Sequence, residues 1–315
     1  MKVVGLPALV PPGSGPSCVS TKPALASTLR ERALLDGAVS TRLLSIAEVE
    51  RLRPAAIVFQ QTFEEPDFHA LEVLAAVSPA LRVLDLDRLP ESGTDDPAFL
   101  RTLGLIDRVV VPVPALAGAL EGLHSDIRVV ADYLPVDWKK NLSPQRRVSQ
   151  RLRVGWCGND PTLDLTLLAQ VLSALSADVD FVVMGDCPVE LRAHVREFHP
   201  QAARESLPAA LLEMKLDLAL LPQLDDLRNG QSLAQLLRFG ACGVPVIACA
   251  RRGDDASLPV THLPADAAVW IEAIRALIAD ADALAGQGDA LRRVVHEQWV
   301  LDEDRQHVWR NAWLP

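Results

Sequence analysis

Short apolar runs alternate with helix-length segments along the whole chain, and this alternation constrains the fold more than any other feature. The runs are rich in Val, Ile and Leu, which is typical of strands buried on both faces of a parallel sheet. The predicted strands are residues 2–5, 55–59, 82–86, 108–111, 127–130, 153–156, 181–184, 216–221 and 244–248. Apolar residues at spacings of three and four predict helices most clearly over residues 163–175, 232–239 and 267–278. Strand–helix alternation predicts an α/β fold with parallel sheets and right-handed crossovers.

The alternation is interrupted by a polar segment, KKNLSPQRRVSQR, at residues 139–151. This segment contains a proline and has no apolar period, which is typical of a linker between domains. We therefore expect one Rossmann-like domain at residues 1–138 and a second at residues 152–295. The helical segment at residues 296–315 is expected to pack back on the domains. Ligands of such sheets bind beyond the carboxyl ends of the strands, so the site is expected in a cleft between the two domains.

Charge and cysteine content argue against several classes of protein. The formal net charge of −10 at pH 7 argues against a nucleic-acid partner, whose phosphates would be repelled. A small anionic ligand is compatible with this charge, because a helix N-terminus binds phosphate locally. The apolar runs are too short for a membrane-spanning helix, and the first residues suit a strand and loop better than a signal peptide. The five cysteines form no CxxC pair, which predicts reduced thiols, a cytoplasmic protein and no structural zinc site.

The segment with the most chemical information covers residues 216–250 and reads LDLALLPQLDDLRNGQSLAQLLRFGACGVPVIACA. Ser232 and Gln235 match a capping box, which predicts a helix that begins near Ser232. A polar loop leads from the end of a strand to this helix start, where free N–H groups would stabilise the diphosphate of a nucleotide. Gly240 and Gly243 allow a tight turn out of the helix before the next strand. An ordinary strand–helix–strand crossover has the same pattern, so both interpretations stay open on these residues alone.

This segment resembles the donor-binding region of GT-B glycosyltransferases of family 4 and of the O-antigen and cell-surface polysaccharide group. The matching residues are Leu237, Phe239, Gly240, Ala241, Gly243, Pro245, Val246, Ile247 and Ala248. Residues 153–158 (RVGWCG) resemble the strand and glycine turn that open the family's C-terminal domain, and residues 107–111 (DRVVV) resemble a segment of its N-terminal domain. The resemblance covers roughly residues 55–313. It implies the GT-B fold, in which two Rossmann-like domains with parallel sheets face each other across a cleft.

The resemblance also implies a function and a set of site residues. We expect a glycosyltransferase of polysaccharide biosynthesis that moves a sugar from a nucleotide diphosphate-sugar to a glycan, lipid-linked or protein acceptor. The resemblance implies no cofactor and no metal, and it allows peripheral association with a membrane or with a partner enzyme. The implied donor-binding residues are Gly158, Asn159, Arg228, Asn229, Gln231, Ser232 and Arg238. The implied acceptor-side residues are Gln60 and Asp85, and no catalytic residue is assigned.

Two departures from the family pattern fall on polar residues of the donor site. The family has a Glu that accepts hydrogen bonds from the donor ribose where this chain has Arg238. It has a Lys or Arg that faces the diphosphate where this chain has Gln231. A hydrogen bond to a charged group contributes about 1.5–3 kcal/mol, so the loss of the Glu would weaken donor binding roughly 10- to 150-fold. The alternative to an active transferase is therefore a catalytically degenerate GT-B protein that serves as a binding or partner subunit of another glycosyltransferase.

Four further patterns have a plainer interpretation. Residues 13–15 (GSG) form a partial dinucleotide fingerprint, for which a flexible loop is the favoured reading. Residues 85–87 (DLD) have the spacing of a metal-binding DxD motif but suit a loop at a strand end. The charged cluster at residues 64–69 could include an acceptor-side base, although solvated loop charge is favoured. His194 and His199 are interpreted as surface residues of a helix.

Overall fold

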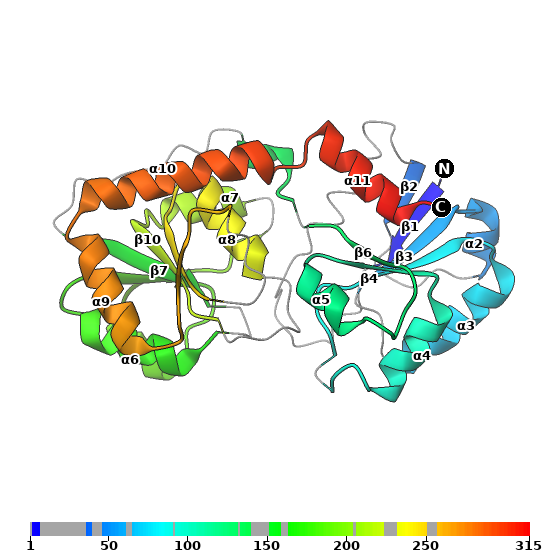
Figure 1. Cartoon of the computed structure of the whole chain (residues 1–315), viewed down its shortest axis with the longest axis horizontal. Helices are drawn as coiled ribbons and strands as arrows, with labels where there is room; N and C mark the ends of the chain where they lie inside the picture. The colour runs from blue at the N-terminus through cyan, green and yellow to red at the C-terminus, as the bar shows by residue number, and fades with distance from the viewer. Residues whose placement is uncertain are drawn as a thin grey trace. The chain divides into compact units, whose positions relative to one another are not determined.

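The structure is a computed structural model that describes residues 2–6, 36–39, 46–60, 65–90, 92–131, 133–139, 151–158, 163–203, 206–223, 232–250 and 257–315. These residues form two compact units, drawn together in Figure 1. Unit 1 contains the described residues up to Pro135 and those from Leu301 onward. Unit 2 contains the described residues from Val136 to Val300. The chain therefore passes from unit 1 to unit 2 and returns to unit 1 for its last helix.

Unit 1 is built on a parallel sheet of six strands in the order β2-β1-β3-β4-β5-β6. The strands are β1 (Lys2–Leu6), β2 (Asp36–Val39), β3 (Ala56–Gln60), β4 (Leu81–Asp85), β5 (Arg108–Val111) and β6 (Ile127–Val129). The helices between them are α2 (Ile46–Leu52), α3 (Glu65–Val77), α4 (Pro97–Leu105) and α5 (Pro114–Ala119). All four helices contribute to one apolar cluster with the strands, and this cluster covers one face of the sheet. The strands read as continuous apolar runs because both faces of the sheet are buried.

The other face of the unit 1 sheet is covered by the last helix, α11 (Glu303–Trp313), drawn in red in Figure 1. Trp309 and Trp313 lie one turn apart on its inner side, with ring centroids separated by 5.2 Å in an edge-to-face arrangement. Both rings pack with Val58, Val83 and Val110 of the central strands. Burial of these two indoles against the sheet fixes α11 on unit 1.

Unit 2 has a second parallel sheet of six strands, in the order β12-β11-β10-β7-β8-β9. The strands are β7 (Arg153–Cys157), β8 (Asp180–Met184), β9 (Val195–His199), β10 (Leu218–Leu221), β11 (Val246–Cys249) and β12 (Thr261–Leu263). The helices are α6 (Leu165–Leu175), α7 (Leu207–Glu213), α8 (Ser232–Ala241), α9 (Ala267–Ile278) and α10 (Ala281–Gln298), with 3-10 turns η1 (Val136–Lys139) and η2 (Val189–His194). Helices α6 and α9 pack together on one face, while α8 contacts β10, β11 and α10.

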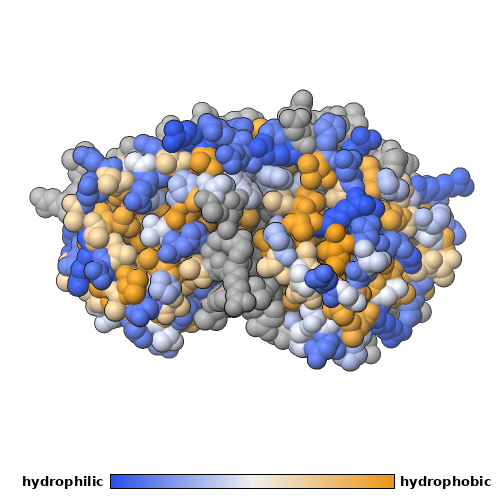
Figure 2. All heavy atoms as spheres, in the orientation of Figure 1, coloured by the Kyte–Doolittle hydropathy of each residue, from blue (hydrophilic) through white to orange (hydrophobic). Residues whose placement is uncertain are grey.

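Helix α10 is amphipathic and lies unusually close to α8. Its buried positions, Leu284, Gly288, Leu291 and Val295, recur at the spacing of one helix face. The opposite face of α10 is exposed to solvent, and the surface over α10 in Figure 2 is accordingly mainly hydrophilic. A Cβ atom on Gly288 would lie 2.2 Å from the carbonyl oxygen of Gly243, and one on Gly240 would lie 2.9 Å from Leu291 and Val295. Glycines at both positions therefore allow the two helices to approach.

The α/β class and the parallel sheets predicted from the sequence are confirmed. Each predicted strand and helix is present, with ends that differ by at most a few residues. Gly243 takes a positive φ of 73° and makes the predicted turn, whereas Gly240 serves the approach of α10. The helix predicted for His199 is wrong, because His199 ends strand β9. His194 does end a helix, the short 3-10 helix η2.

No α-helix in the described ranges combines the length and the apolar character needed to cross a membrane.

Candidate functional site

The strand order of unit 2 locates its ligand site. The chain enters the sheet at β7, adds β8 and β9 on one side, and then continues with β10 on the other side of β7. This is the Rossmann order, and the connections leave β7 and β10 in opposite directions. In such sheets a crevice forms beyond the carboxyl ends of the two strands where the order reverses. The candidate site is therefore at the carboxyl ends of β7 and β10, which we call the switch point.

The loops that follow β7 and β10 are joined to each other at the switch point. Leu163, at the end of the first loop, forms an antiparallel bridge with Gln223, at the beginning of the second. The backbone N–H of Asp164 donates to the carbonyl of Pro222 at 2.6 Å. The carboxylate of Asp164 accepts from the N–H of Leu167 at 2.9 Å and caps the start of α6. One aspartate thus fixes both the start of a helix and the contact between the two loops.

Gly158, the residue after β7, packs directly on the loop that follows β8. Its N–H donates to the carbonyl of Met184 at 2.8 Å. A Cβ atom at this position would lie 1.6 Å from the carbonyl oxygen of Asp186, which leaves no room for any side chain. Packing against Asp186 therefore requires a glycine here, whether or not Gly158 has its predicted role in donor binding. Glycine brings the ends of β7 and β8 together.

Two adjoining pockets open beside Gly158 at the carboxyl ends of β7, β8 and β9. The switch-point pocket has a volume of about 410 Å³ and is lined by Gly158, Leu163, Leu165, Asp186, Cys187, Pro188 and Arg192. The β9 pocket has a volume of about 260 Å³ and is lined by Gly185, Asp186, Cys187, Arg192 and Phe198. Asp186 and Cys187 of the β8–η2 connection and Arg192 of η2 line both pockets, so the pockets form one continuous surface.

Arg192 is the cation of these pockets. Its Nε donates to the carbonyl of Cys187 at 3.1 Å, which fixes the guanidinium relative to the β8–η2 connection. Within the part of the chain that the structure describes, it forms no ion pair, so its charge is available to a ligand. Burial raises the pKa of the Cys187 thiol, while the charge of Arg192 acts in the opposite direction. The thiol therefore stays protonated at neutral pH and is a poor nucleophile.

Helix α8 begins at Ser232, as the capping-box prediction requires, although the side chain of Ser232 lies outside the described residues. Asn159, Arg228, Asn229 and Gln231 also lie outside them, so their donor-binding roles stay predictions. Arg238 is in the last turn of α8 and is half-buried. It makes no ion pair with any residue that the structure describes. The positive N-terminal end of α8 follows the β10 loop, on the carboxyl side of the sheet.

Comparison with solved structures identifies this architecture. HepE from Anabaena, in complex with UDP and glucose, has a TM-score of 0.66 and 16% sequence identity over 99% of both chains. A glycosyltransferase from Rickettsia africae has a TM-score of 0.63 and 12% identity over 99% of this chain and 97% of that chain. The lipopolysaccharide outer core galactosyltransferase WaaB has a TM-score of 0.62 and 11% identity over 99% of both chains. These neighbours are GT-B glycosyltransferases. The chain has the GT-B fold. A scan against protein-family models and a search of curated proteins give no match.

In GT-B terms, unit 1 is the N-terminal sheet, and its order reverses between β1 and β3. Gln60 is the last residue of β3 and therefore lies at this second switch point. Asp85 ends β4 directly opposite Gln60 in the strand register and is only 1% exposed. The structure thus places the two residues predicted for the acceptor side next to each other on the backbone, with the Gln60 side chain outside the described residues.

The described charged residues near this edge are not grouped as a metal site. Asp87 is buried like Asp85, and Glu65 begins α3, whose first side chains lie outside the described residues. Among the described residues, no three His, Cys, Asp or Glu side chains are grouped as metal ligands. The GSG segment at residues 13–15 lies outside the described ranges, so its role stays a prediction.

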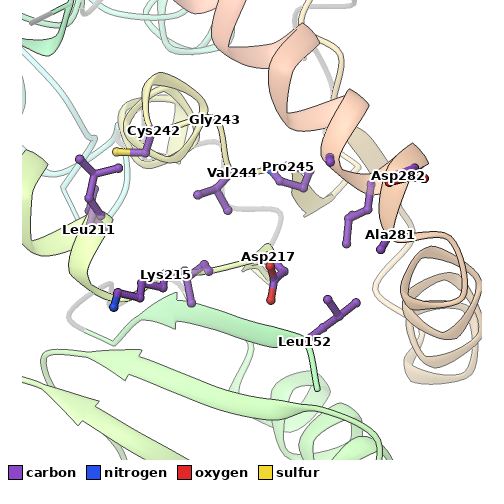
Figure 3. A pocket seen from close by; sticks show the side chains of 14 residues that line it. Leu152, Leu211, Lys215, Asp217, Cys242, Gly243, Val244, Pro245, Ala281 and Asp282 are labelled. Atoms are coloured by element: carbon purple, nitrogen blue, oxygen red, sulfur yellow. The ribbon is translucent and has the colours of Figure 1, made fainter. Parts of the chain in front are cut away.

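A third pocket lies at the opposite, amino-terminal edge of the unit 2 sheet (Figure 3). Its lining includes Leu152, Asp217 and Val244, which come just before β7, β10 and β11. The Asp217 carboxylate accepts a hydrogen bond from the backbone N–H of Arg153 at 2.8 Å and so stabilises the start of strand β7. Burial raises the pKa of the Cys242 thiol to about 12, which keeps it protonated at neutral pH. These contacts are structural, and the pocket is separated from the switch point by the length of the strands.

Arg192 and Phe198 are site residues that the sequence did not single out. Arg192 lies in η2, the 3-10 turn that follows β8, and Phe198 lies in the edge strand β9. The sequence shows a phenylalanine between Glu197 and His199 in REFHP. This pattern alone does not tell whether the ring is exposed at a pocket or buried in the core.

Proposed function

We propose that this chain is a glycosyltransferase that transfers a sugar from a nucleotide diphosphate-sugar to a hydroxyl of a glycan, lipid-linked or protein acceptor. The observation that carries the proposal is the switch point of unit 2. There the glycine turn after β7 and the loop from β10 to α8 are joined by the Leu163–Gln223 bridge. The two segments with the strongest resemblance to a donor site therefore meet at one end of one sheet. The complexes of HepE with UDP and with UDP-glucose, on the same fold, agree with this choice of ligand.

The proposed chemistry rests on positioning and on charge. The diphosphate of the donor would lie at the start of α8, where unpaired N–H groups and a helix dipole of about half an elementary charge favour an anion. The Gly158 turn lines the switch-point pocket and would lie beside the donor. Negative charge that develops on the leaving diphosphate would be stabilised by these groups in the transition state. Gln60 and Asp85, at the switch point of unit 1, are proposed for the acceptor side.

The absence of a CxxC pair among the cysteines fits a reducing compartment, so we place the reaction in the cytoplasm. Partner association at a membrane surface or with another enzyme fits a lipid-linked or glycan acceptor. The reaction requires only the nucleotide-sugar and the acceptor, and the proposal includes no cofactor.

A second function is favoured by one observation, the arginine at position 238. The resemblance implies a carboxylate here, and the structure shows a half-buried Arg238 that is not paired with any described residue. A guanidinium cannot accept hydrogen bonds from ribose hydroxyls. The second candidate is therefore a non-catalytic GT-B subunit that supports a partner glycosyltransferase.

Calorimetric titration of the full chain with UDP, GDP and their sugars tests the proposal. We expect saturable binding of at least one nucleotide. The variant S232E adds a negative charge at the start of α8 and should weaken this binding at least tenfold, because it repels the diphosphate. The matched control is S173E, which adds the same charge to an exposed position about two turns beyond the start of α6. S173E should bind as the unmodified protein does.

The outcomes separate the two candidate functions. Nucleotide binding together with slow release of nucleoside diphosphate from a nucleotide-sugar, even without an acceptor, supports the transferase. Nucleotide binding without any turnover of the bound sugar supports the non-catalytic subunit. If neither UDP nor GDP binds, the donor site proposed at the switch point is wrong.

A further inference from the structure

Phe198 is an exposed aromatic ring at the carboxyl edge of the unit 2 sheet. It lies on edge strand β9 and is 50% exposed, although a phenylalanine at a strand end normally buries its ring. Its position is fixed by the sheet, because the N–H of Gly185 donates to the carbonyl of His199 at 2.9 Å. The ring lines the β9 pocket, so its exposed face borders a concave surface. A flat apolar ligand would find a rigid stacking surface here.

Arg192 supplies directed donors beside this ring. Its Nε is occupied by the carbonyl of Cys187, which holds the guanidinium against the β8–η2 connection. The two terminal nitrogens have no partner among the described residues. Arginine is donor-only and always charged, so an acceptor oxygen or nitrogen of a ligand is required to satisfy it. The β9 pocket therefore combines a stacking face with hydrogen-bond donors.

The β9 pocket adjoins the switch-point pocket on the side away from β10. Strands β7, β8 and β9 are consecutive neighbours, so the ends of β7 and β9 are separated by roughly 10 Å, two strand spacings. A nucleoside diphosphate can extend from the switch point, where the diphosphate is proposed to lie, along the end of β8 to a base beyond β9. The shared lining of the two pockets, Asp186, Cys187 and Arg192, forms the surface between them.

We propose that the donor's base stacks on Phe198 and accepts hydrogen bonds from Arg192 in the β9 pocket. The inference rests on the proposed function and adds the class of base. A donor-only side chain matches a base edge that presents carbonyl oxygens, as uracil and guanine do. Adenine presents an amino donor at the corresponding position, which faces Arg192 unfavourably. The site is therefore selective for uridine or guanosine diphosphates over adenosine diphosphate.

Calorimetry with UDP, GDP, ADP and inorganic pyrophosphate tests the stacking role of Phe198. The variant F198A should weaken binding of the preferred nucleoside diphosphate about 5- to 150-fold, the range that loss of one base–aromatic stack gives. It should leave pyrophosphate binding unchanged, because pyrophosphate has no base. F198Y keeps the ring and should retain most of the affinity that F198A loses. V189A is the matched control, since Val189 is 71% exposed on η2 and lines neither pocket.

The variant R192Q tests the selection of the base. Glutamine offers one acceptor and one donor, the pair that matches adenine. R192Q should therefore bind UDP or GDP at least tenfold more weakly and should reduce their advantage over ADP. Thermal unfolding without ligand checks that each variant is folded, as expected for exposed positions.

The result separates this inference from the proposed function. If the unmodified protein binds neither UDP nor GDP, both fall. If it binds one of them and F198A binds it equally well, the base lies elsewhere and only the inference is overturned. A loss of pyrophosphate binding in F198A, equal to the loss of nucleotide binding, would also overturn it. Base-dependent weakening in F198A, with most of the affinity retained in F198Y and V189A unchanged, supports it.

Discussion

At the scale of single residues, Gly288 determines how closely α10 lies to the turn after α8. Replacing it with alanine places a Cβ 2.2 Å from the carbonyl oxygen of Gly243, so α10 must move. We expect G288A to lower the free energy of unfolding by about 1–3 kcal/mol, as overpacking does. G286A is its control on the same helix, because a Cβ there meets nothing within 4 Å. G286A should raise stability by about 0.5–1 kcal/mol through helix propensity. Urea unfolding measures both, and equal effects would contradict this account.

The same scale shows what the sequence of the site could reveal. The glycine at position 158 was predictable from its place after a buried strand, and the structure adds the contact with Asp186 that requires it. Arg192 and Phe198 were not predictable, because their importance depends on where the fold places their side chains. Nothing in REFHP states that the phenylalanine faces a pocket rather than the core, and only the fold decides this.

At the scale of an element, Asp164 links the start of α6 to the β10 loop. D164A removes the acceptor for the N–H of Leu167 and should destabilise unit 2 by about 1 kcal/mol. D164N keeps a capping side chain and should lower the stability of unit 2 by only a few tenths of the D164A effect. D266A removes a similar cap from α9, which follows edge strand β12, and should cost about as much as D164A. Only D164A should also weaken nucleotide binding, and calorimetry after a stability measurement checks this. Equal nucleotide affinity in D164A and D266A would argue against a site at the switch point.

Elements differed in how far their sequence predicted them. Central strands such as β4 and β8 are buried on both faces, so their apolar runs stand out. The strands that were missed, β2, β9 and β12, all lie at sheet edges. Their sequences, DGAV, VREFH and THL, are short or polar because an edge strand meets solvent. The charged and histidine residues of β9 also explain why its sequence favours the prediction of a surface helix.

At the scale of the whole molecule, the C-terminal helix is held on unit 1 by Arg108. Its NH1 donates to the carbonyls of Ala312 and Leu314, at 3.0 and 2.7 Å, and its Nε donates to Asp126 at 2.8 Å. We expect R108A to destabilise unit 1 by about 2–3 kcal/mol, because charged hydrogen bonds to buried carbonyls are lost. Hydrogen exchange should then accelerate in α11 and β5 while β7 and β8 stay protected.

The control for R108A is R101A, which removes an exposed ion pair with Glu72 on the helices of the same unit. Such a pair contributes less than about 1 kcal/mol, so exchange in α11 should be unaffected. If R101A and R108A had the same effect on exchange in α11, the hydrogen bonds from Arg108 to Ala312 and Leu314 would not explain how the last helix is held.

The return of the chain to unit 1 has a consequence for biosynthesis. Among the described residues, those that cover the face of the first sheet with Val58, Val83 and Val110 come mainly from Leu301 onward. A ribosome adds about 5–20 residues per second, so on the order of ten seconds separate the emergence of Pro135 from that of α11. Unit 2 is complete on the nascent chain before unit 1 is, although unit 1 comes first in the sequence. During that interval this sheet face lacks the two indoles of α11 that pack on it, and the unit that starts first finishes last.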